Sequence, residues 1–174
     1  SDNSGTGTCT CTVGYTSSND ICTACAAGYY KKSFGTSACI QVSQGYYAVD
    51  ASAASTSSAA IDEFVCTSGT YSSVGATQCT QATAGYYTTD GDGVATDGAA
   101  TAQEACAPGY YSVGGATECT QATAGYYTTN GGGTSVNTAA IAQEPCASGY
   151  FSGAGATECT QASAGYFASD ISGN

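Results

Sequence analysis

Aromatic and polar residues alternate along the chain in short runs, each opened by a glycine and closed by a polar segment. Examples are Tyr46 and Tyr47 after Gly45, and the runs Tyr86–Thr89 and Tyr126–Thr129. Tyrosine, threonine and valine favour β-strands, whereas glycine, serine and aspartate favour turns. The pattern therefore predicts short strands joined by turns. Adjacent side chains in a strand point to opposite faces, so one tyrosine of each pair should cover its module and the other face a neighbour.

Longer segments separate these runs and differ from one another in sequence: residues 48–65, 90–105 and 130–145. The alanine-rich ends of the last two, residues 99–104 and 139–144, contain good helix formers. We expect each of these ends to form one helical turn.

A long stretch recurs along the chain. Residues 106–129 read CAPGYYSVGGATECTQATAGYYTT, and the stretch returns with small substitutions at 66–89 and 146–169, with a period of 40. A looser copy begins at Cys25. A fixed period of this length is typical of a tandem array in which each module contacts mainly its neighbours. We therefore predict short β-hairpin modules forming an elongated rod. The expected divisions are a lead-in with a partial module (1–24), repeats at 25–65, 66–105 and 106–145, and an incomplete repeat at 146–174.

The cysteines follow the same period. Each copy has a cysteine, two residues, a glycine, usually an aromatic residue, and then a second cysteine. The last three copies have only two cysteines each, which favours closure within the module, worth roughly 3 kcal/mol for a loop of about 14 residues. A bond from Cys79 to Cys106 would instead join successive modules, and sequence alone does not decide connectivity. The predicted disulfides are Cys11–Cys22, Cys25–Cys39, Cys66–Cys79, Cys106–Cys119 and Cys146–Cys159.

Cys9 has no predicted partner among the eleven cysteines. An odd cysteine in a secreted chain indicates a free thiol, an intermolecular disulfide, or a partner outside these residues. The three alternatives stay open.

The composition leaves little material for an ordinary hydrophobic core. The 174 residues include no Leu, Met, Trp, His or Arg, and Ile, Val and Phe together number 17. Few large aliphatic residues with a net charge of −11 would by themselves indicate disorder. Disulfides can replace a core that the side chains do not build. Cysteines at this density without histidine favour an oxidising compartment over zinc sites, so we expect an extracellular, cell-surface protein.

Several function classes are disfavoured. Lys31 and Lys32 are the only cations, so nucleic acid is not expected as a partner. No apolar run approaches the roughly 20 residues of a membrane span. The chain has no His or Arg, and its Cys22-x-x-Cys25 motif lies outside any βαβ context, so we do not expect an enzyme.

The end of the lead-in and the start of the first repeat read Cys22-Thr-Ala-Cys25-Ala-Ala-Gly28-Tyr29. This double-cysteine frame and its continuation resemble the small repeats of ephrin-receptor-like and tumour-necrosis-factor-receptor-like modules. They are also similar to repeats in protist surface proteins such as ciliate immobilisation antigens and flagellar-hair shafts. The resemblance covers residues 9–167 and implies an extracellular rod or adhesive surface without catalytic residues. The chain departs from the frame where other residues replace its cysteines: Val42, Ala82, Ala122 and Ala162 for the second, and Glu63, Gln103 and Gln143 for the first.

An oxygen-rich loop follows the second aromatic run. Carboxylates two residues apart with glycine between them can supply several of the six to eight oxygens that calcium takes. The equivalent positions of the next repeat are Asn130, Gly132 and Asn137, which removes most of the charge. A solvated turn is therefore favoured, and no cofactor is expected, with calcium as the alternative. The calcium candidates are Asp90, Asp92 and Asp97.

Hydroxyl-bearing and aromatic residues are the remaining candidates for surface chemistry. Serine and threonine total 47 residues, and extracellular segments rich in them accept O-glycans. Aromatic pairs can cover disulfides, stack on carbohydrate or contact a neighbouring chain. The O-glycan candidates are Thr88, Thr89, Thr128 and Thr129. The interface candidates are Tyr46, Tyr47, Tyr86, Tyr87, Tyr126, Tyr127, Tyr166 and Phe167.

The near-identity of the repeats favours a structural role. Identical faces make regular contacts geometrically natural, so we expect self-association into a surface filament or coat with an acidic, O-glycosylated surface. The alternative is a ligand-binding receptor or adhesin ectodomain segment. Its one candidate patch is Lys31-Lys32-Ser-Phe34, which holds both cations of the chain.

Overall fold

The computed structural model describes residues 10–169. Sixteen short strands in this range pair into eight two-stranded sheets, which confirms the predicted small, disulfide-rich, mainly β fold with hairpins repeating about every 40 residues. None of the described residues forms a helix, so none forms a helix long and apolar enough to cross a membrane. The strands are β1 (Tyr15–Ser18), β2 (Ile21–Ala24), β3 (Tyr29–Tyr30), β4 (Ile40–Gln41), β5 (Tyr46–Val49), β6 (Asp62–Val65), β7 (Thr70–Tyr71), β8 (Thr80–Gln81), β9 (Tyr86–Thr89), β10 (Ala102–Ala105), β11 (Tyr110–Tyr111), β12 (Thr120–Gln121), β13 (Tyr126–Thr129), β14 (Ala142–Pro145), β15 (Tyr150–Phe151) and β16 (Thr160–Gln161).

Two kinds of hairpin alternate along the chain. The long hairpins have four-residue strands: β1–β2, β5–β6, β9–β10 and β13–β14. The short hairpins have two-residue strands: β3–β4, β7–β8, β11–β12 and β15–β16. Predicted aromatic runs open the long hairpins, where Tyr46 pairs with Val65 and Tyr126 pairs with Pro145.

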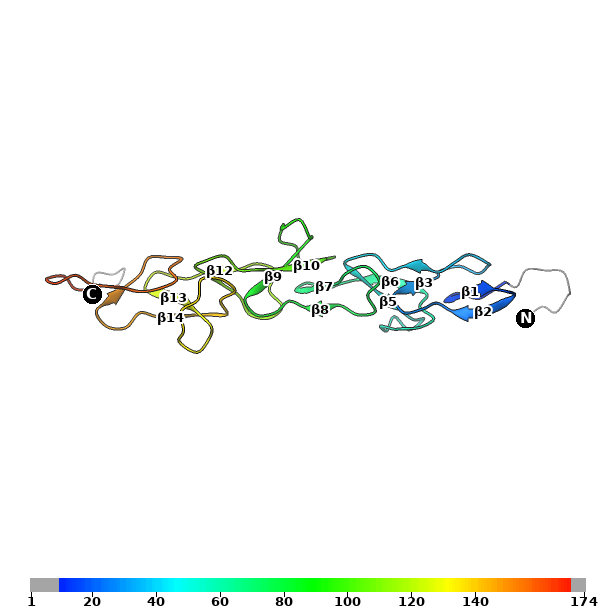
Figure 1. Cartoon of the computed structure of the whole chain (residues 1–174), viewed down its shortest axis with the longest axis horizontal. Coiled ribbons are helices and arrows are strands. Elements are labelled where there is room, and N and C mark those ends of the chain that lie inside the picture. The colour runs from blue at the N-terminus through cyan, green and yellow to red at the C-terminus, as the bar shows by residue number, and fades with distance from the viewer. Residues whose placement is uncertain (1–9, 170–174) are drawn as a thin grey trace. The chain divides into compact units, whose positions relative to one another are not determined.

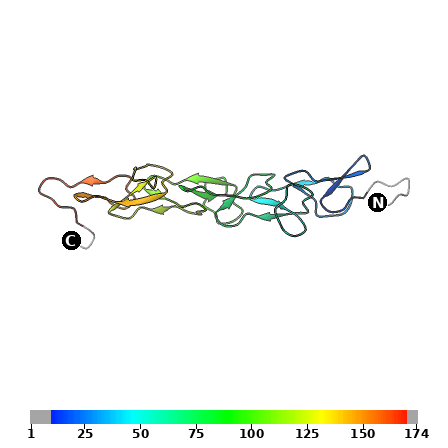
Figure 2. The ribbon, with the colours of Figure 1, turned by 90° about the horizontal axis from the view of Figure 1, so that it is seen from below.

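The chain divides into two compact units. Unit 1 contains residues 1–80 and 98–102, and unit 2 contains residues 81–97 and 103–174. Within each unit the hairpins follow one another in chain order, beginning with β1–β2 (blue) in unit 1 and ending with the orange hairpin β15–β16 in unit 2 (Figures 1 and 2). Segment 98–102 belongs to unit 1 because its alanines bond to the short hairpin closed by Cys66, as described below.

Five disulfides close the hairpins, and their pairing is the one that the sequence predicts. Cys11–Cys22 closes the long hairpin β1–β2, whereas Cys25–Cys39, Cys66–Cys79, Cys106–Cys119 and Cys146–Cys159 each close a short hairpin. Their Cα atoms lie 5.5–5.8 Å apart. Disulfides at this density are typical of an oxidising, extracellular or secreted environment. Cys9 lies outside the described residues.

The later long hairpins lack the disulfide of β1–β2, and a hydrogen bond closes them instead. In β5–β6, Glu63 holds the position of Cys22, and its Oε2 accepts the N–H of Ser43 at 2.7 Å. Val42, which is buried, holds the position of Cys11. An amide makes the same closure in later repeats: Gln103 Oε1 accepts from Thr83 N–H at 2.7 Å, and Gln143 Oε1 accepts from Thr123 N–H at 2.8 Å.

Small side chains make up most of the buried interior of each unit. The buried apolar cluster of unit 1 consists of Tyr30, Val42, Ala48 and Ala60, with Tyr46 packed against it. Most of the other buried side chains are alanine, cysteine, serine or threonine, and side chains of this size let the backbones of adjacent hairpins lie close together. Backbone hydrogen bonds between hairpins therefore hold the hairpins together, as contacts between large aliphatic side chains do in an ordinary core.

The predicted helical turns at 99–104 and 139–144 are wrong. Strands β10 and β14 occupy the second halves of these segments, paired with β9 and β13. The preceding Ala99 and Ala139 have left-handed backbones, with φ of 52° and 53°. Pairing with the tyrosine-containing strands and docking on the neighbouring short hairpin override the weak helical preference of alanine.

Each of these alanines begins an alanine pair, a name used here for residues 59–60, 99–100 and 139–140. The pair at 99–100 docks on the short hairpin that begins at Cys66. Ala99 donates its N–H to Cys66 O at 3.3 Å, and Ala100 O accepts the N–H of Ser72 at 3.1 Å. Tyr71 and Ala100 also form a parallel β-bridge. The other pairs dock in the same way, at Cys25 and Cys106.

The glycine before each aromatic pair lies at the centre of this contact. Gly85 has a φ of 85°, donates its N–H to Ser112 O at 2.9 Å and accepts the N–H of Cys106 at 2.8 Å. A Cβ atom at Gly85 would collide with the backbone carbonyl of Ala139. Gly45 has the same arrangement with Ala99. The glycine is therefore needed both for its left-handed backbone and for the close approach of the alanine pair.

We expect Gly85→Ala to lower the free energy of unfolding by about 2–5 kcal/mol. Left-handed strain accounts for about 1–2 kcal/mol, and overpacking against Ala139 for about 1–3 kcal/mol. Gly125→Ala isolates the first contribution, because Gly125 has a φ of 84° but no described atom within 4 Å of the added Cβ. Gly153→Ala should be nearly neutral, because its φ is not left-handed and its added Cβ also meets open space. Denaturant unfolding of the three variants checks this order, and equal losses at Gly85 and Gly125 would contradict it.

We also expect Ala122→Cys with Gln143→Cys to form a sixth disulfide at the position that Cys11 and Cys22 occupy in β1–β2. Loop closure stabilises by about 3 kcal/mol and the lost hydrogen bond costs about 1 kcal/mol, so the net gain is about 2 kcal/mol. Intact mass with thiol counting detects the bond, and denaturant unfolding measures its effect. Ala122→Ser with Gln143→Ser is the matched control. Two thiols that stay reduced under oxidising conditions would show that the positions are not equivalent.

Candidate interaction surfaces

The backbone of each aromatic pair takes part in the contact between a long hairpin and the next short hairpin. We call this contact a joint. Ser72 Oγ donates to Tyr46 O at 2.7 Å, and Ser112 Oγ donates to Tyr86 O at 2.8 Å. Ser152 Oγ makes the same bond to Tyr126 O at 2.7 Å. In each case the serine comes from the next short hairpin along the chain. The first tyrosine of each pair therefore carries a structural bond in addition to any contact that its ring makes.

The second tyrosine of the later pairs reaches across its own long hairpin. Tyr87 Oη donates to Glu104 Oε2 at 3.5 Å, and Tyr127 Oη donates to Gly133 O at 3.3 Å. Partial burial and the nearby Glu104 carboxylate raise the pKa of Tyr87 above its usual value. Tyr47, the equivalent residue of unit 1, is likewise half-buried.

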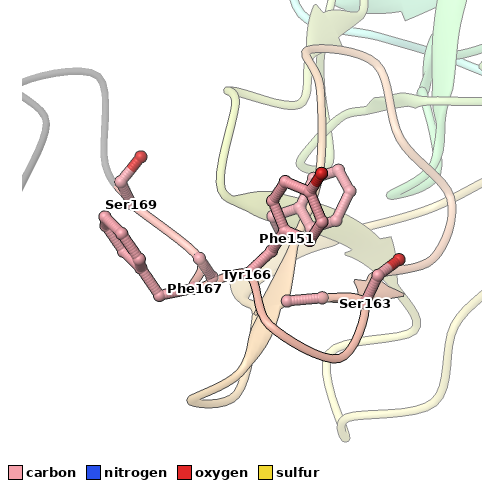
Figure 3. Close-up of a pocket in the computed structure, with 7 residues that line it drawn as sticks. Phe151, Ser163, Tyr166, Phe167 and Ser169 are labelled. Atoms are coloured by element: carbon pink, nitrogen blue, oxygen red, sulfur yellow. The ribbon is translucent and has the colours of Figure 1, made fainter.

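The last aromatic pair differs from the others. Tyr166 and Phe167 are 80% and 81% exposed and belong to no strand. Together with Phe151 and Ser163 they line an open hollow of about 380 Å³ in unit 2 (Figure 3). The Phe167 ring lies apart from the Phe151 ring, on the side of Ser169 (Figure 3). Of the predicted interface residues, this pair offers the largest free aromatic surface.

The side chain of Lys31 is buried in a contact between two hairpins. It is only 2% exposed, and its Nζ donates to Tyr15 O at 2.8 Å and to Gly35 O at 2.6 Å. Lys31 occupies the position of Ser72 in the next repeat, and its ammonium makes the bond that the serine hydroxyl makes there. The candidate patch Lys31-Lys32-Ser-Phe34 therefore does not present both cations to solvent, because Lys31 holds two hairpins together. Phe34 is exposed.

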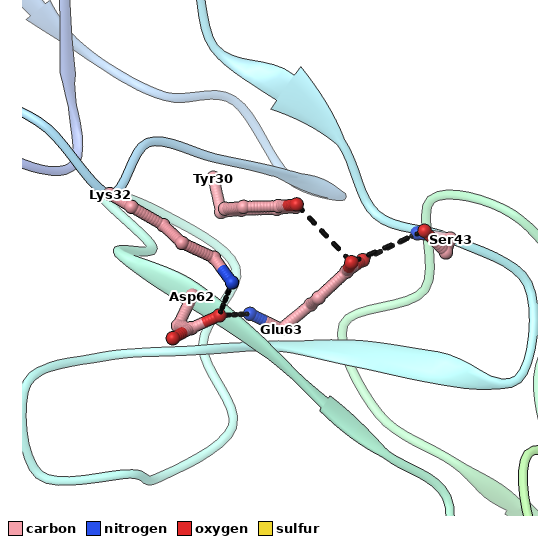
Figure 4. Close-up of polar contacts among 5 residues, drawn as sticks. All are labelled: Tyr30, Lys32, Ser43, Asp62 and Glu63. Carbon is pink, nitrogen blue, oxygen red and sulfur yellow. Dashed lines mark hydrogen bonds and ion pairs between the residues drawn. The ribbon is translucent and has the colours of Figure 1, made fainter.

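The second cation belongs to a polar network between hairpins β3–β4 and β5–β6 (Figure 4). Lys32 Nζ lies 2.6 Å from Asp62 Oδ1 and 5.3 Å from the centre of the Tyr30 ring. Its ammonium holds the pKa of Asp62 below the usual value. Glu63 accepts from Tyr30 Oη at 3.2 Å as well as from the Ser43 N–H. Burial, and then the Glu63 charge, raise the pKa of Tyr30.

The calcium candidates form an ordinary turn. Asp90 Oδ1 accepts the N–H groups of Asp92 and Val94 at 2.9 and 3.1 Å. Asn130 Oδ1 makes the equivalent pair of bonds in the next repeat, so the turn closes with a neutral side chain. Among residues 10–169, no group of three or more His, Cys, Asp or Glu side chains is placed to hold a metal ion. Asp97 is exposed.

The predicted O-glycan sites are buried. Thr88, Thr89, Thr128 and Thr129 are all 0% exposed. Thr88 Oγ1 donates to Thr96 O at 2.6 Å and Thr128 Oγ1 to Val136 O at 2.9 Å, so both hydroxyls secure loops of their own hairpins. A sugar cannot be attached to these residues in the folded chain. Exposed hydroxyls occur instead in the long-hairpin loops, at Ser52, Ser55, Ser57, Ser58, Thr134 and Ser135.

No family model and no curated protein matches the chain. The resemblance to ephrin-receptor-like and tumour-necrosis-factor-receptor-like modules therefore stays a prediction.

In an alkaline titration, we expect Tyr30 and Tyr87 to ionise above the usual pKa of a tyrosine side chain, which is about 10. Their folded pKa values are raised, so the stability that their neutral forms contribute is present below about pH 10 and is lost as the pH rises through the folded pKa. Absorbance at the phenolate band measures the ionisation. Tyr30→Phe should remove about half of the absorbance change that appears at the highest pH, here called the last component.

Glu63→Gln is the matched variant for this titration, because glutamine stands at the equivalent position in the next two repeats. It should move Tyr30 toward its usual pKa while its ring stays buried. A last component that neither substitution changes would mean that the Tyr30–Glu63 contact does not form.

Proposed function

We propose that the chain is a structural extracellular repeat protein, a subunit of a surface filament or coat. The observation that carries this proposal is the recurrence of one joint between hairpins. Gly45, Gly85 and Gly125 each donate an N–H to the serine carbonyl of the next short hairpin, at 2.9–3.0 Å. Each of those serines returns a hydroxyl bond to the residue after the glycine. Joints made of the same bonds give the repeats the same local geometry, and repeated faces favour regular association.

The covalent and surface chemistry supports an extracellular setting for this role. Five disulfides need an oxidising compartment, and a net charge of −11 keeps a polar surface solvated. The exposed hydroxyls of the long-hairpin loops, residues 52–58 and 134–135, are the O-glycan acceptors that we propose in place of the buried threonines.

A receptor or adhesin segment is the second candidate. The observation that favours it is the exposed aromatic hollow of Phe151, Tyr166 and Phe167, since exposed aromatic rings are enriched at binding sites. This hollow lies in the last repeat, whereas the joints recur throughout the described chain.

Electron microscopy of the native material, together with intact-mass analysis before and after chemical deglycosylation, separates the two functions. A structural subunit should appear in ordered fibres or sheets and carry extra mass on peptides from residues 52–58 or 134–135. Dispersed single molecules at the bare polypeptide mass would overturn the proposal and favour the receptor or adhesin segment.

A further inference from the structure

One turn recurs in the loops of three long hairpins, and either an acid or an amide closes it. The first residue of the turn accepts backbone N–H groups from two and four residues ahead through a single side-chain oxygen. The two bonds measure 2.8 and 3.1 Å at Asp50, 2.9 and 3.1 Å at Asp90, and 3.0 and 3.3 Å at Asn130. Because a charged acceptor makes the stronger bond, a carboxylate fits this position at least as well as an amide.

Asn130 is the member of this set that can react with its own backbone. Asparagine is chemically labile, and a following glycine makes it most so, because no Cβ keeps the glycine nitrogen away from the amide carbon. Asn130 is followed by Gly131, and both residues are exposed to water. The other two asparagines among residues 10–169, Asn19 and Asn137, are followed by residues that carry side chains. Sequence and exposure together therefore single out Asn130.

A buried hydroxyl holds the nitrogen that would attack. Gly131 donates its N–H to Thr129 Oγ1 at 3.2 Å, and Thr129 Oγ1 donates to Glu144 Oε1 at 3.5 Å. Thr129 is fully buried, so its hydroxyl keeps this place in the folded hairpin. In the preceding repeat the equivalent Thr89 Oγ1 is buried and has no hydrogen-bond partner among the described residues. The hydroxyl at position 129 therefore makes a bond that the hydroxyl at position 89 does not make.

We propose that Asn130–Gly131 is a deamidation site of the folded chain, and that the Thr129 hydroxyl limits its rate. Gly131 N loses its proton and forms a bond to Asn130 Cγ, and the Cγ–Nδ2 bond breaks to release ammonia. A water molecule then opens the cyclic imide at either carbonyl, which leaves aspartate or isoaspartate. The net change is the gain of one water and the loss of one ammonia, so no oxidant or reductant is required.

The attack requires a local opening of the loop. The two bonds to Asn130 Oδ1 and the bond to Thr129 must break before Gly131 N can reach Asn130 Cγ. Exposed loops open at a low cost in free energy. The fold therefore slows the reaction without preventing it.

The two products should differ in their effect on the turn. Aspartate at position 130 keeps the acceptor oxygen and reproduces the arrangement at Asp90, with one more negative charge on the loop. Isoaspartate carries the main chain through the former side chain, so the oxygen that closed the turn becomes a backbone carbonyl and the turn is lost. This modification goes beyond the proposed structural role and does not depend on it.

The test is a timed incubation of the folded full chain in mildly alkaline buffer, followed by peptide mapping with mass spectrometry and isoaspartate-specific methylation. Asn130 should convert to aspartate and isoaspartate while Asn137, in the same loop, stays intact. Thr129→Val should speed the conversion by about fivefold, the factor that the loss of one neutral hydrogen bond corresponds to. Two controls should leave the rate unchanged: Thr129→Ser keeps the hydroxyl, and Thr89→Val removes a hydroxyl that has no partner among the described residues. Denaturant unfolding checks that each variant is folded.

A free peptide of residues 126–137 decides the matter if Thr129→Val does not fold. The full chain should react at least about fivefold more slowly than the peptide, because the peptide lacks the held N–H group. A chain that does not react while the peptide does would overturn the site. A chain as fast as the peptide, or a folded Thr129→Val variant at the unchanged rate, would overturn the role of the hydroxyl. Aspartate without isoaspartate would overturn the cyclic intermediate.

Discussion

Close approach of backbone to backbone at the glycines before the aromatic pairs is the contact on which the rest of the fold depends. At Gly45 and Gly85 an alanine carbonyl occupies the space of a Cβ atom. The glycine bonds through both its N–H and its carbonyl to the next short hairpin. The chain can therefore hold its hairpins together without leucine or methionine, because polar backbone groups that would otherwise need water satisfy one another. Alanine, serine and threonine fill the interior because larger side chains would separate these backbones.

The long hairpins are closed at equivalent positions either by a disulfide or by a hydrogen bond. The hairpin β1–β2 is closed by Cys11–Cys22, and β5–β6 is closed at the same positions by buried Val42 and by the bond from Ser43 to Glu63. The covalent closure acts mainly by restricting the unfolded chain, whereas the hydrogen bond acts only in the folded hairpin. The short hairpins all keep their disulfides. Their two-residue strands make too few ladder bonds to be stable alone, so the covalent bond is needed there.

The sequence predicted what is determined locally and missed what is determined by contacts between hairpins. Disulfide pairing within the modules was predicted because each of the last three copies contains only two cysteines, and the tyrosine runs formed strands as their β propensity indicated. The burial of Lys31 and of Thr88 was not predictable from their polar side chains. Each is buried because its polar atom finds carbonyl partners, Lys31 across a hairpin joint and Thr88 within its own loop. The left-handed Ala99 was missed for the same reason, since its backbone is set by docking on Cys66.

Because the joint is made mostly by backbone atoms, different side chains are compatible with it. The residue that donates across the joint is serine at positions 72, 112 and 152 but lysine at position 31. In all four cases the acceptor is the backbone carbonyl of the tyrosine that follows the glycine. Any side chain that delivers a donor to that carbonyl preserves the joint. The outer loops are still freer, as Asp50, Asp90 and Asn130 close the same turn with different charges. Repeats can therefore differ in sequence at the surface while the hydrogen bonds between hairpins stay the same. In such a tandem array, the free energy of unfolding depends on how many joints are formed.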